Sequence, residues 1–281
     1  MKSKKTIFGL GCGHLHIEGF KNGVELVKYA FLKGIRYFDV ATSYPDFKEN
    51  RGLNEKILRE GLGENIKSAF VATKIISRDY ENAKKEFLES LNRLEKIDMV
   101  QLHSVDDKET LNLVKNGALK FLVDIKKEKK IKFIGLTNHY DPKITLLALR
   151  KFKEIDSFMI PINIFNFLVK RKNFEKIIPL AKRKKKKIIA MLVFGCGLLK
   201  DFPDLALKYA YTKKPHVILI GAKNVDELEK DLKIIKKIRR INKREFNLLK
   251  EIGKKILKED KNKAWWLNGH IGAFPFGKIN L

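Results

Sequence analysis

The sequence has few cysteines and no long apolar run, and these absences exclude several classes of protein. Its two cysteines, Cys12 and Cys196, form no disulfide framework and lack the spacing of a metal site. No stretch reaches the roughly 20 apolar residues of a membrane-spanning helix, and the first apolar run is too short for the core of a signal peptide. We therefore expect a cytoplasmic protein with no membrane partner.

Acidic residues are also scarce, since 33 Asp and Glu face 60 Lys and Arg, for a net charge of +27. Such a charge indicates either an anionic partner such as nucleic acid, or a lysine-rich composition that reflects coding bias or heat adaptation. The lysines lie on many predicted helices, and the densest run, Lys182–Lys187, ends a helix, where cations complement the helix dipole. We therefore expect no nucleic-acid binding beyond nonspecific electrostatic attraction.

Apolar runs rich in β-branched and aromatic residues alternate with longer amphipathic stretches along the 281 residues. The expected strands are Thr6–Cys12, Arg36–Ala41, Ala69–Ile75, Asp98–His103, Lys132–Asn138, Phe158–Asn163, Lys187–Val193 and Val217–Gly221. The expected helices are Ile17–Leu32, Asn54–Gly61, Asp79–Glu95, Lys108–Lys129, Pro142–Phe152, Asn173–Lys185, Pro203–Tyr211 and Val225–Ile238.

Eight strand-then-helix units with short connections predict parallel strands, and eight such units close a (β/α)8 TIM barrel. The alternative, a doubly wound open sheet, needs a glycine-rich fingerprint, and residues 9–16 (GLGCGHLH) open on His14 rather than on a clean helix. We expect the barrel over residues 1–240, followed by a C-terminal helix, Lys243–Lys258, and an aromatic tail that ends at residue 281. That tail either covers part of the barrel mouth or packs on the barrel wall.

Polar side chains stand at or just after the ends of three successive predicted strands. Asp39 ends the second strand, Lys74 the third and His103 the fourth, and Tyr44 follows Asp39 by five residues. In a parallel barrel the carboxyl ends of the strands converge on one mouth, where such enzymes do their chemistry. Singly, each residue has a simpler explanation, as a loop cap, a surface lysine or a core histidine. Their coincidence at consecutive strand ends predicts an active site.

The four side chains together predict a device that delivers a proton to an oxygen. A tyrosine hydroxyl has a pKa of about 10, and a neighbouring lysine ammonium favours the phenolate and lowers that pKa. A carboxylate that holds the lysine fixes its position, and a histidine beside the hydroxyl orients a carbonyl oxygen or helps to donate the proton. A ketone oxygen that becomes negative on accepting a hydride is the expected acceptor.

Several motifs, in order, resemble those of the aldo-keto reductase family. They are YFDVATSY at 37–44, ENRGLNEKILREGL at 49–62, VATKI at 71–75, DMVQLHS at 98–104, GLTNHY at 135–140, MLVFGCGLL at 191–199 and ILIGAKNVDELEKDL at 218–232. The resemblance implies a (β/α)8 barrel that reduces a small-molecule carbonyl with a nicotinamide cofactor and without a Rossmann domain. By the same resemblance Tyr44 is the general acid, Lys74 and Asp39 tune it, and His103 orients the substrate carbonyl.

The resemblance also implies which residues meet the cofactor. Thr137 and Asn138 match the positions that hold the carboxamide of the nicotinamide, and Met191 the position where many members stack an aromatic ring. The remaining expected cofactor contacts are Gly11 and Cys12, through their backbone, together with Asp39 and Gly221.

Two residues depart from the family pattern. Met159 stands where the family has a glutamine that contacts the carboxamide, so one hydrogen bond is lost. Glu227 stands where a basic residue commonly grips the adenosine 2′-phosphate, although Lys223 lies nearby in the sequence. A carboxylate repels a phosphate but accepts a hydrogen bond from a ribose hydroxyl. NADP(H) is therefore the cofactor that the resemblance implies, with NAD(H) as the alternative.

The C-terminal tail resembles one further family feature. FPFGKI, residues 274–279, is similar to the end of the cysteine-rich iron–sulfur segment found in one branch of the family, but residues 241–281 contain no cysteine. We therefore expect no iron–sulfur cluster and no metal. An accessory or regulatory barrel that binds cofactor without efficient turnover is the alternative to an active reductase, and the sequence specifies neither the substrate nor an oligomeric state.

Overall fold

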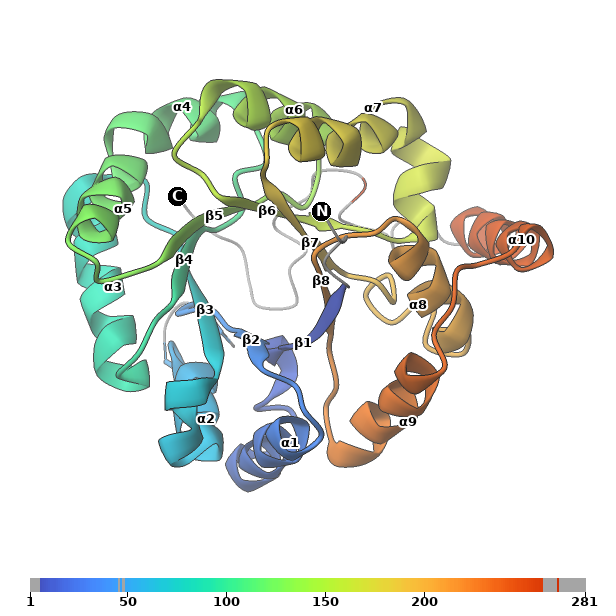
Figure 1. Cartoon of the computed structure of the whole chain (residues 1–281), viewed down its shortest axis with the longest axis horizontal. Helices are drawn as coiled ribbons and strands as arrows, with labels where there is room; N and C mark the ends of the chain where they lie inside the picture. Colours follow the sequence, from blue (N-terminus) through green and yellow to red (C-terminus); the bar gives the residue numbers. More distant parts are fainter. Residues whose placement is uncertain (1–5, 45, 47–48, 260–266, 268–281) are drawn as a thin grey trace.

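Eight parallel strands form a closed barrel surrounded by helices (Figure 1), in a computed structural model that describes residues 6–44, 46, 49–259 and 267. Each strand pairs with the next along the chain, and β8 closes the barrel on β1. The predicted (β/α)8 TIM barrel is therefore confirmed. The strands are β1 Ile7–Gly11, β2 Tyr37–Asp39, β3 Phe70–Ile75, β4 Met99–Leu102, β5 Phe133–Thr137, β6 Ser157–Pro161, β7 Lys187–Met191 and β8 Val217–Ile220.

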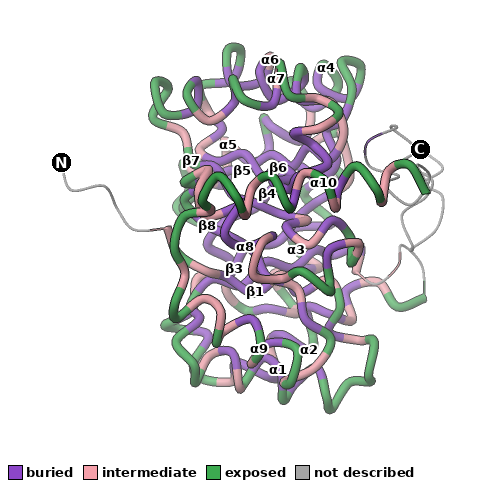
Figure 2. The backbone as a smooth tube through the Cα atoms, turned by 90° about the vertical axis from the view of Figure 1, so that its right-hand side faces the viewer, coloured by how far each residue is buried: buried purple, intermediate pink, exposed green. Residues whose placement is uncertain are grey.

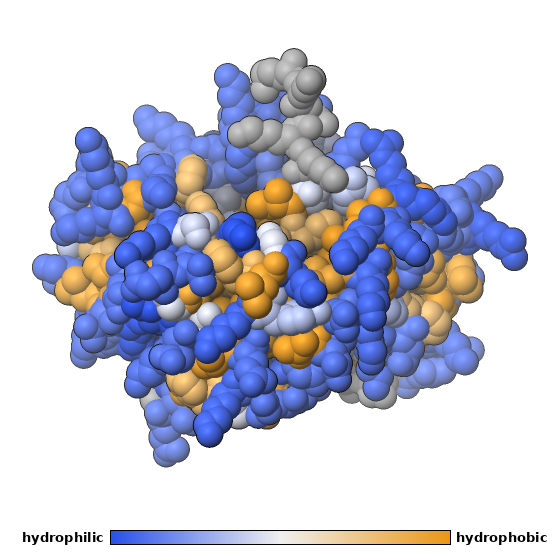
Figure 3. Space-filling model, turned by 60° about the horizontal axis from the view of Figure 1, so that its bottom comes forward, coloured by the Kyte–Doolittle hydropathy of each residue, from blue (hydrophilic) through white to orange (hydrophobic). Residues whose placement is uncertain are grey.

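The helices lie outside the strands and bury one face against them. The α-helices are α1 Phe20–Leu32, α2 Leu53–Leu62, α3 Tyr80–Leu94, α4 Lys108–Asn116, α5 Ala118–Lys127, α6 Pro142–Lys151, α7 Ile164–Arg183, α8 Pro203–Thr212, α9 Val225–Lys236 and α10 Lys243–Glu259. Two short 3-10 helices are η1 Cys12–His14 and η2 Gly63–Ser68. Buried residues concentrate where helices face the barrel (Figure 2), and hydrophilic side chains cover most of the face in Figure 3. Within the part of the chain that the structure describes, no helix has the length and apolar character to cross a membrane.

Side chains alternate between the two sides of the barrel wall. One set forms an apolar cluster inside the barrel, and the other packs into the larger core that the strands share with the helices. Because successive strand residues point to opposite sides, Asp39 and Lys74, each two residues beyond an inner-cluster residue (Tyr37 and Ala72), also face the barrel interior. The strands thus carry apolar residues inside the barrel and polar residues at its mouth.

Two predicted helices have different bounds in the structure. The segment expected as one helix over 108–129 is two helices, α4 and α5, because the chain breaks at Gly117. A Cβ added to Gly117 would lie 2.1 Å from the Arg78 carbonyl oxygen, so the backbones approach too closely for a side chain. The segment Ile164–Arg183 is kinked at Lys170, where the backbone is not helical, so the helix expected from Asn173 is its second part. A further helical stretch precedes the kink and begins at Ile164, where the Asn163 side chain accepts from the Asn166 backbone N–H.

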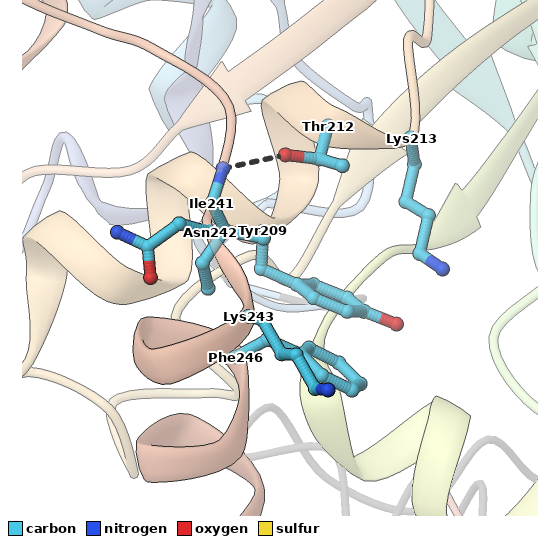
Figure 4. Close-up of a pocket in the computed structure, with 7 residues that line it drawn as sticks. All are labelled: Tyr209, Thr212, Lys213, Ile241, Asn242, Lys243 and Phe246. Atoms are coloured by element: carbon cyan, nitrogen blue, oxygen red, sulfur yellow. Dashed lines mark hydrogen bonds between the residues drawn. The ribbon is translucent and has the colours of Figure 1, made fainter.

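The last described helix, α10, packs against α7 and α8 on the outside of the barrel. The Phe246 ring contacts the rings of Phe167 and Tyr209, with centroids 5.3 and 6.2 Å apart. Figure 4 shows a pocket of about 270 Å³ beside this helix, where the Ile241 backbone N–H donates to Thr212 Oγ1 at 2.9 Å. The lining residues come from α8, α10 and the segments that follow α8 and precede α10. The predicted tail, apart from Leu267, lies outside the described residues.

The start of α2 requires a glycine. Gly52 has a φ of +77°, and a Cβ there would lie 2.4 Å from Arg93 Nε. The Arg93 side chain cannot move aside cheaply because it donates to Glu55 Oε2 at 2.6 Å and to Thr42 Oγ1 at 2.8 Å. Gly34 also has a positive φ, of +92°, but nothing lies within 4 Å of its added Cβ.

We expect Gly52→Ala to lower the free energy of unfolding by about 2–3 kcal/mol, since it adds a steric clash to backbone strain. The matched variant Gly34→Ala should lose only the strain, about 1–2 kcal/mol. Urea unfolding followed by circular dichroism measures both values. Equal losses would show that Arg93 relaxes freely and does not constrain this turn.

Candidate active site

Asp39 and Lys74 form a buried ion pair at the ends of β2 and β3. Both side chains are almost fully buried, with 3% and 2% of their surfaces exposed. Lys74 Nζ donates to Asp39 Oδ1 and, at 2.7 Å, to the Val40 carbonyl oxygen. The other carboxylate oxygen, Asp39 Oδ2, accepts from Gln101 Nε2 at 2.7 Å. The lysine ammonium is therefore held by two acceptors, and Gln101 fixes one of them, the Asp39 carboxylate.

Tyr44 and His103 lie against this pair. Lys74 Nζ is 4.9 Å from the centroid of the Tyr44 ring, and the Tyr44 and His103 rings meet edge to face with centroids 5.9 Å apart. His103 is buried, whereas Tyr44 is partly exposed. The structure thus brings all four side chains predicted from the strand ends into one cluster.

Burial dominates the electrostatics of the tyrosine. Burial raises the pKa of Tyr44 above its ordinary value, although the Lys74 ammonium opposes this and Asp39 adds to it. The lysine therefore lowers the pKa of Tyr44 as its pairing predicts, but the net shift is upward, which corrects the expectation of a depressed value. At neutral pH the hydroxyl keeps its proton, as a proton donor must.

The lysine of the ion pair keeps its charge despite its burial. Burial lowers the pKa of Lys74, but the Asp39 charge and Tyr44 outweigh it and raise that pKa above the ordinary lysine range. Burial raises the pKa of Asp39, while Lys74 and Gln101 oppose the rise through their charge and hydrogen bonds. The mouth of the barrel therefore contains a fixed positive charge next to a phenol.

His103 is neutral in this setting. Burial, the charge of Lys74 and the neighbouring His139 and Arg78 hold the pKa of His103 well below its ordinary value. Ser43 Oγ lies 3.5 Å from His103 Nδ1, and the His139 ring centroid lies 5.7 Å from that of His103. A neutral imidazole has one N–H group, with which it can donate one hydrogen bond to a carbonyl oxygen.

A buried network holds the loop that carries Tyr44. Glu55, which is fully buried on α2, accepts from Thr73 Oγ1 at 2.6 Å and from Arg93 Nε at 2.6 Å. Arg93 also donates to Thr42 Oγ1, two residues before Tyr44. The loop after β2 is thereby fastened to β3 and α3, the elements that follow it in the sequence.

The residues expected at the carboxamide lie at the end of β5 and are tied to the loop after β4. Thr137 Oγ1 accepts from the Ser104 backbone N–H at 2.7 Å, and Asn138 Nδ2 donates to the Val105 carbonyl oxygen at 2.9 Å. Both side chains are buried. Their positions next to His103 in the barrel wall follow from the pairing of β4 with β5.

The ends of β1 and β8 present little side chain. Gly11 ends β1 and pairs with Asp39, and the following residue, Cys12, has a carbonyl oxygen that accepts from Asn54 Nδ2 at 2.9 Å. Asn54 Nδ2 also donates to the Gly13 carbonyl oxygen, at 3.0 Å. A Cβ added to Gly221, just after β8, would meet His14 Nδ1 at 3.4 Å. Glycine backbone and the His14 imidazole therefore lie together on this side of the mouth.

Met159 and Met191 belong to the apolar cluster inside the barrel, and both are buried. Met159 pairs with Thr137 across β5 and β6, which places it beside the expected carboxamide site, where a thioether donates no hydrogen bond. Polar groups thus lie on one side of the mouth, at Thr137 and Asn138, and the methionines belong to the apolar cluster inside the barrel.

Glu227 takes part in the N-terminal cap of α9. Its Oε2 accepts from the Lys223 backbone N–H at 2.9 Å, and its own N–H donates to Asn224 Oδ1 at 3.0 Å. Asn224 Nδ2 donates in turn to Glu18 Oε1, at 2.6 Å, in the segment before α1. The side chains of Lys223 and Glu227 are exposed, so both charges face solvent at this helix end.

Sequence reasoning missed three residues of the site. Gln101, Ser43 and His139 were not among the predicted residues, although Gln101 contacts Asp39 and the other two lie beside His103. Gln101 had a signal, because it is a polar residue in an apolar strand two positions before His103 and so on the same side. Over the described residues no group of acidic, histidine or cysteine side chains could hold a metal ion, and residues 274–279 lie outside them.

Comparison with known proteins identifies similar chains. The model of the family described as "Aldo/keto reductase family" matches residues 9–204. "Probable aldo-keto reductase 1" of Glycine max is 35% identical over 148 residues, which cover 46% of this chain and 40% of that relative, so the match spans less than half of its length.

Solved structures of low identity share the fold. An aldo-keto reductase from Bacillus halodurans, in its holo form, superposes with a TM-score of 0.71 at 18% identity, over 87% of this chain and 91% of its own. An aldo-keto reductase from a Medee basin deep-sea metagenome library gives 0.68 at 16%, over 89% and 92%. Aldose reductase from Giardia lamblia gives 0.67 at 13%, over 91% and 94%.

The lowered pKa of His103 predicts a loss of stability in acid. Below a pH of about 6.5 the unfolded chain binds a proton at this residue that the folded chain does not, so the free energy of unfolding falls as the pH falls. Between pH 6.5 and 5 the free energy of unfolding of His103→Gln should fall by about 1–2 kcal/mol less than that of the unchanged protein. Urea unfolding at several pH values measures this difference.

Ser43→Ala is the control, since it removes a neighbour of the imidazole but keeps the titrating group, and its acid loss should match that of the unchanged protein. Parallel stability curves for His103→Gln and the unchanged protein would show that His103 takes up its proton equally in both states.

Proposed function

The chain belongs to the aldo/keto reductase family, and we propose that it reduces an aldehyde or ketone to the alcohol with a nicotinamide cofactor, with Tyr44 as the proton donor. The observation that carries this proposal is the buried cluster in which Tyr44 lies against both the Lys74–Asp39 pair and His103. We propose further that the enzyme acts in the cytoplasm on a small-molecule carbonyl compound.

Tyr44 supplies the proton that the product oxygen needs. A nicotinamide cofactor held at the mouth would supply a hydride to the carbonyl carbon, and negative charge would develop on the carbonyl oxygen. The hydroxyl of Tyr44 donates its proton to that oxygen, which leaves a phenolate. Because the pKa of Tyr44 is raised by burial, the hydroxyl is protonated before the reaction starts.

Lys74 stabilises the phenolate that proton transfer leaves behind. Its ammonium is fixed by Asp39 and by the Val40 carbonyl oxygen, so little reorganisation is needed when the charge on Tyr44 appears. Asp39 supports this arrangement without contacting the substrate oxygen. The pair therefore assists the second half of the step, after the hydroxyl has given up its proton.

His103 orients the substrate. A neutral imidazole next to Tyr44 donates a hydrogen bond to the carbonyl oxygen and holds it near the phenol. Because His103 does not carry a positive charge, the proton comes from Tyr44 rather than from the imidazole. The two residues thus have separate roles, one in position and one in proton transfer.

Thr137 and Asn138 would hold the carboxamide of a nicotinamide cofactor, and Met191 would pack against its ring. The backbone of Gly11, Cys12 and Gly221 would face the cofactor from the other side of the mouth. NADP(H) follows from the family resemblance, but the exposed carboxylate of Glu227, beside Lys223, weakens any preference for a 2′-phosphate.

We expect Tyr44→Phe to lower kcat by about 10²–10⁴, since it removes the proton donor and leaves the ring that packs in the cluster. Cofactor affinity should change little. The measurement is the oxidation of NADPH and NADH at 340 nm with a panel of aldehydes, dicarbonyls and quinones, combined with cofactor binding by fluorescence.

The control is Tyr80→Phe, which removes a hydroxyl that donates to Asp124 Oδ2 at 3.3 Å on the outer helices and should keep full activity. Turnover that survives in Tyr44→Phe would exclude Tyr44 as the acid. Failure of the unchanged protein to bind either nucleotide would overturn the proposed function as a whole.

The position of Glu227 gives a second prediction. Glu227→Gln keeps an acceptor for the Lys223 N–H and removes the negative charge, so the ratio of NADPH to NADH affinity should rise about two- to five-fold. Isothermal titration with each nucleotide measures the ratio. Glu109→Gln, which removes an exposed carboxylate from the first turn of α4, should leave it unchanged. An unaltered ratio in Glu227→Gln would place the 2′-phosphate away from this residue.

A further inference from the structure

The end of the barrel opposite the proposed active site carries a dense set of cations. Because all eight strands are parallel, the loops that lead into them lie together at the ends where the strands begin. Figure 1 shows β5, β6 and β7 as neighbours in the barrel wall, and three consecutive loops enter them. Cations cluster at residues 126–132 before β5, at 150–153 before β6 and at 182–187 before and at the start of β7, in these loops and in the helix ends that precede them.

Direct contacts join these loops into one surface, here called the basic end. Lys186 Nζ donates to the Lys153 carbonyl oxygen at 2.7 Å, which connects the loops before β7 and β6. Lys126 Nζ donates to Asp156 Oδ2 at 2.5 Å, which connects the loops before β5 and β6. These two contacts place the three loops on adjoining segments of one surface.

Most of the positive charge of the basic end is not neutralised. Lys126, Lys130 and Lys132 form ion pairs with Asp156, Glu128 and Asp98. In contrast, the six cations of residues 182–187 form no ion pair with any carboxylate of the described chain, and five of the six are exposed. A surface of this kind attracts a ligand that carries several negative charges along its length.

An aromatic ring is exposed among these cations. Phe133, the first residue of β5, is 41% exposed and directly follows the exposed Lys132. Its ring lies 5.8 Å from that of Phe70, which stacks on the Tyr37 ring at 5.0 Å with an interplanar angle of 12°. The basic end thus has a row of three neighbouring aromatic rings that runs from inside the barrel to solvent, and its outer ring, Phe133, is partly exposed.

We propose that the basic end binds single-stranded nucleic acid, with phosphates on the lysines of residues 182–187 and the neighbouring loops and a base stacked on Phe133. Cations spread over three loops suit a charged backbone, and an exposed ring offers a base a stacking partner of any sequence. An anionic membrane surface fits less well, because α5, α6 and the second part of α7, which lead into these loops, pack their apolar residues against the core of the protein and have none free to insert into lipid. The site is separate from the proposed reaction, which takes place at the other end of the strands.

The test is binding of the full chain to fluorescently labelled DNA and RNA strands of about 20 nucleotides and mixed sequence, at about 50–200 mM salt. The double variant Lys182→Gln, Lys184→Gln should bind about tenfold more weakly at about 100 mM salt, and the slope of log affinity against log salt should fall by about 1.4. The control, Lys84→Gln with Lys85→Gln on α3, has the same net charge and should bind as the unchanged protein does.

Phe133→Leu separates stacking from charge. It keeps an apolar side chain in the barrel floor, so we expect about fivefold weaker binding of single strands with no change in salt dependence or in binding of a duplex. Reductase turnover should be unaltered in every variant, so that a failure of this proposal is distinct from a failure of the proposed function.

Three results would overturn the proposal. The first is no binding of either strand at low salt, and the second is an equal loss of affinity in the α3 control. The third is a duplex bound as tightly as a single strand with no effect of Phe133→Leu. Binding to vesicles that contain anionic phospholipid, without binding to either strand, would assign the basic end to a membrane instead. A preference between DNA and RNA would define the class of nucleic acid without changing the proposal.

Discussion

The ion pair between Lys74 and Asp39 is the constraint on which the rest of the site depends. Two charges removed from water cost several kcal/mol each unless their geometry and further hydrogen bonds compensate. Here two hydrogen bonds compensate. The Val40 carbonyl oxygen, just after β2, accepts from Lys74, and Gln101 on β4 donates to Asp39. The pair is therefore stable only where three neighbouring strands are in register, and that requirement places Tyr44 and His103 as well.

The sequence predicted the barrel and four residues of the site because both depend on local patterns. Short apolar runs alternated with amphipathic stretches, and Asp39, Lys74 and His103 each stood at a strand end, a position that topology alone brings to one mouth. Other features depend on tertiary contacts that no local pattern records. The break at Gly117 arises from the Arg78 carbonyl oxygen, and the upward shift in the pKa of Tyr44 arises from burial that its neighbours do not cancel.

The grouping of the lysines also depends on the fold and could not be predicted from the sequence. In the linear sequence they are spread over many helices, which favoured a compositional explanation. In the fold the C-terminal halves of α5, α6 and α7 lead into adjacent strands, so their cations meet on one surface around Phe133. The role of Glu227 also depends on the fold. In the sequence it is a carboxylate at a position where the family resemblance predicts a basic residue, and only the structure shows that it takes part in the cap of α9.

Asn54 connects two parts of the barrel mouth, the segment after β1 and the loop after β2. Its side chain holds the carbonyl oxygens of Cys12 and Gly13, and its backbone N–H donates to the Tyr44 carbonyl oxygen at 3.5 Å. One residue at the start of α2 thus links the backbone on one side of the mouth to the loop that carries the phenol. A displacement of Asn54 would therefore disturb both sides of the mouth together, the backbone of Cys12 and Gly13 through its side chain and that of Tyr44 through its own N–H.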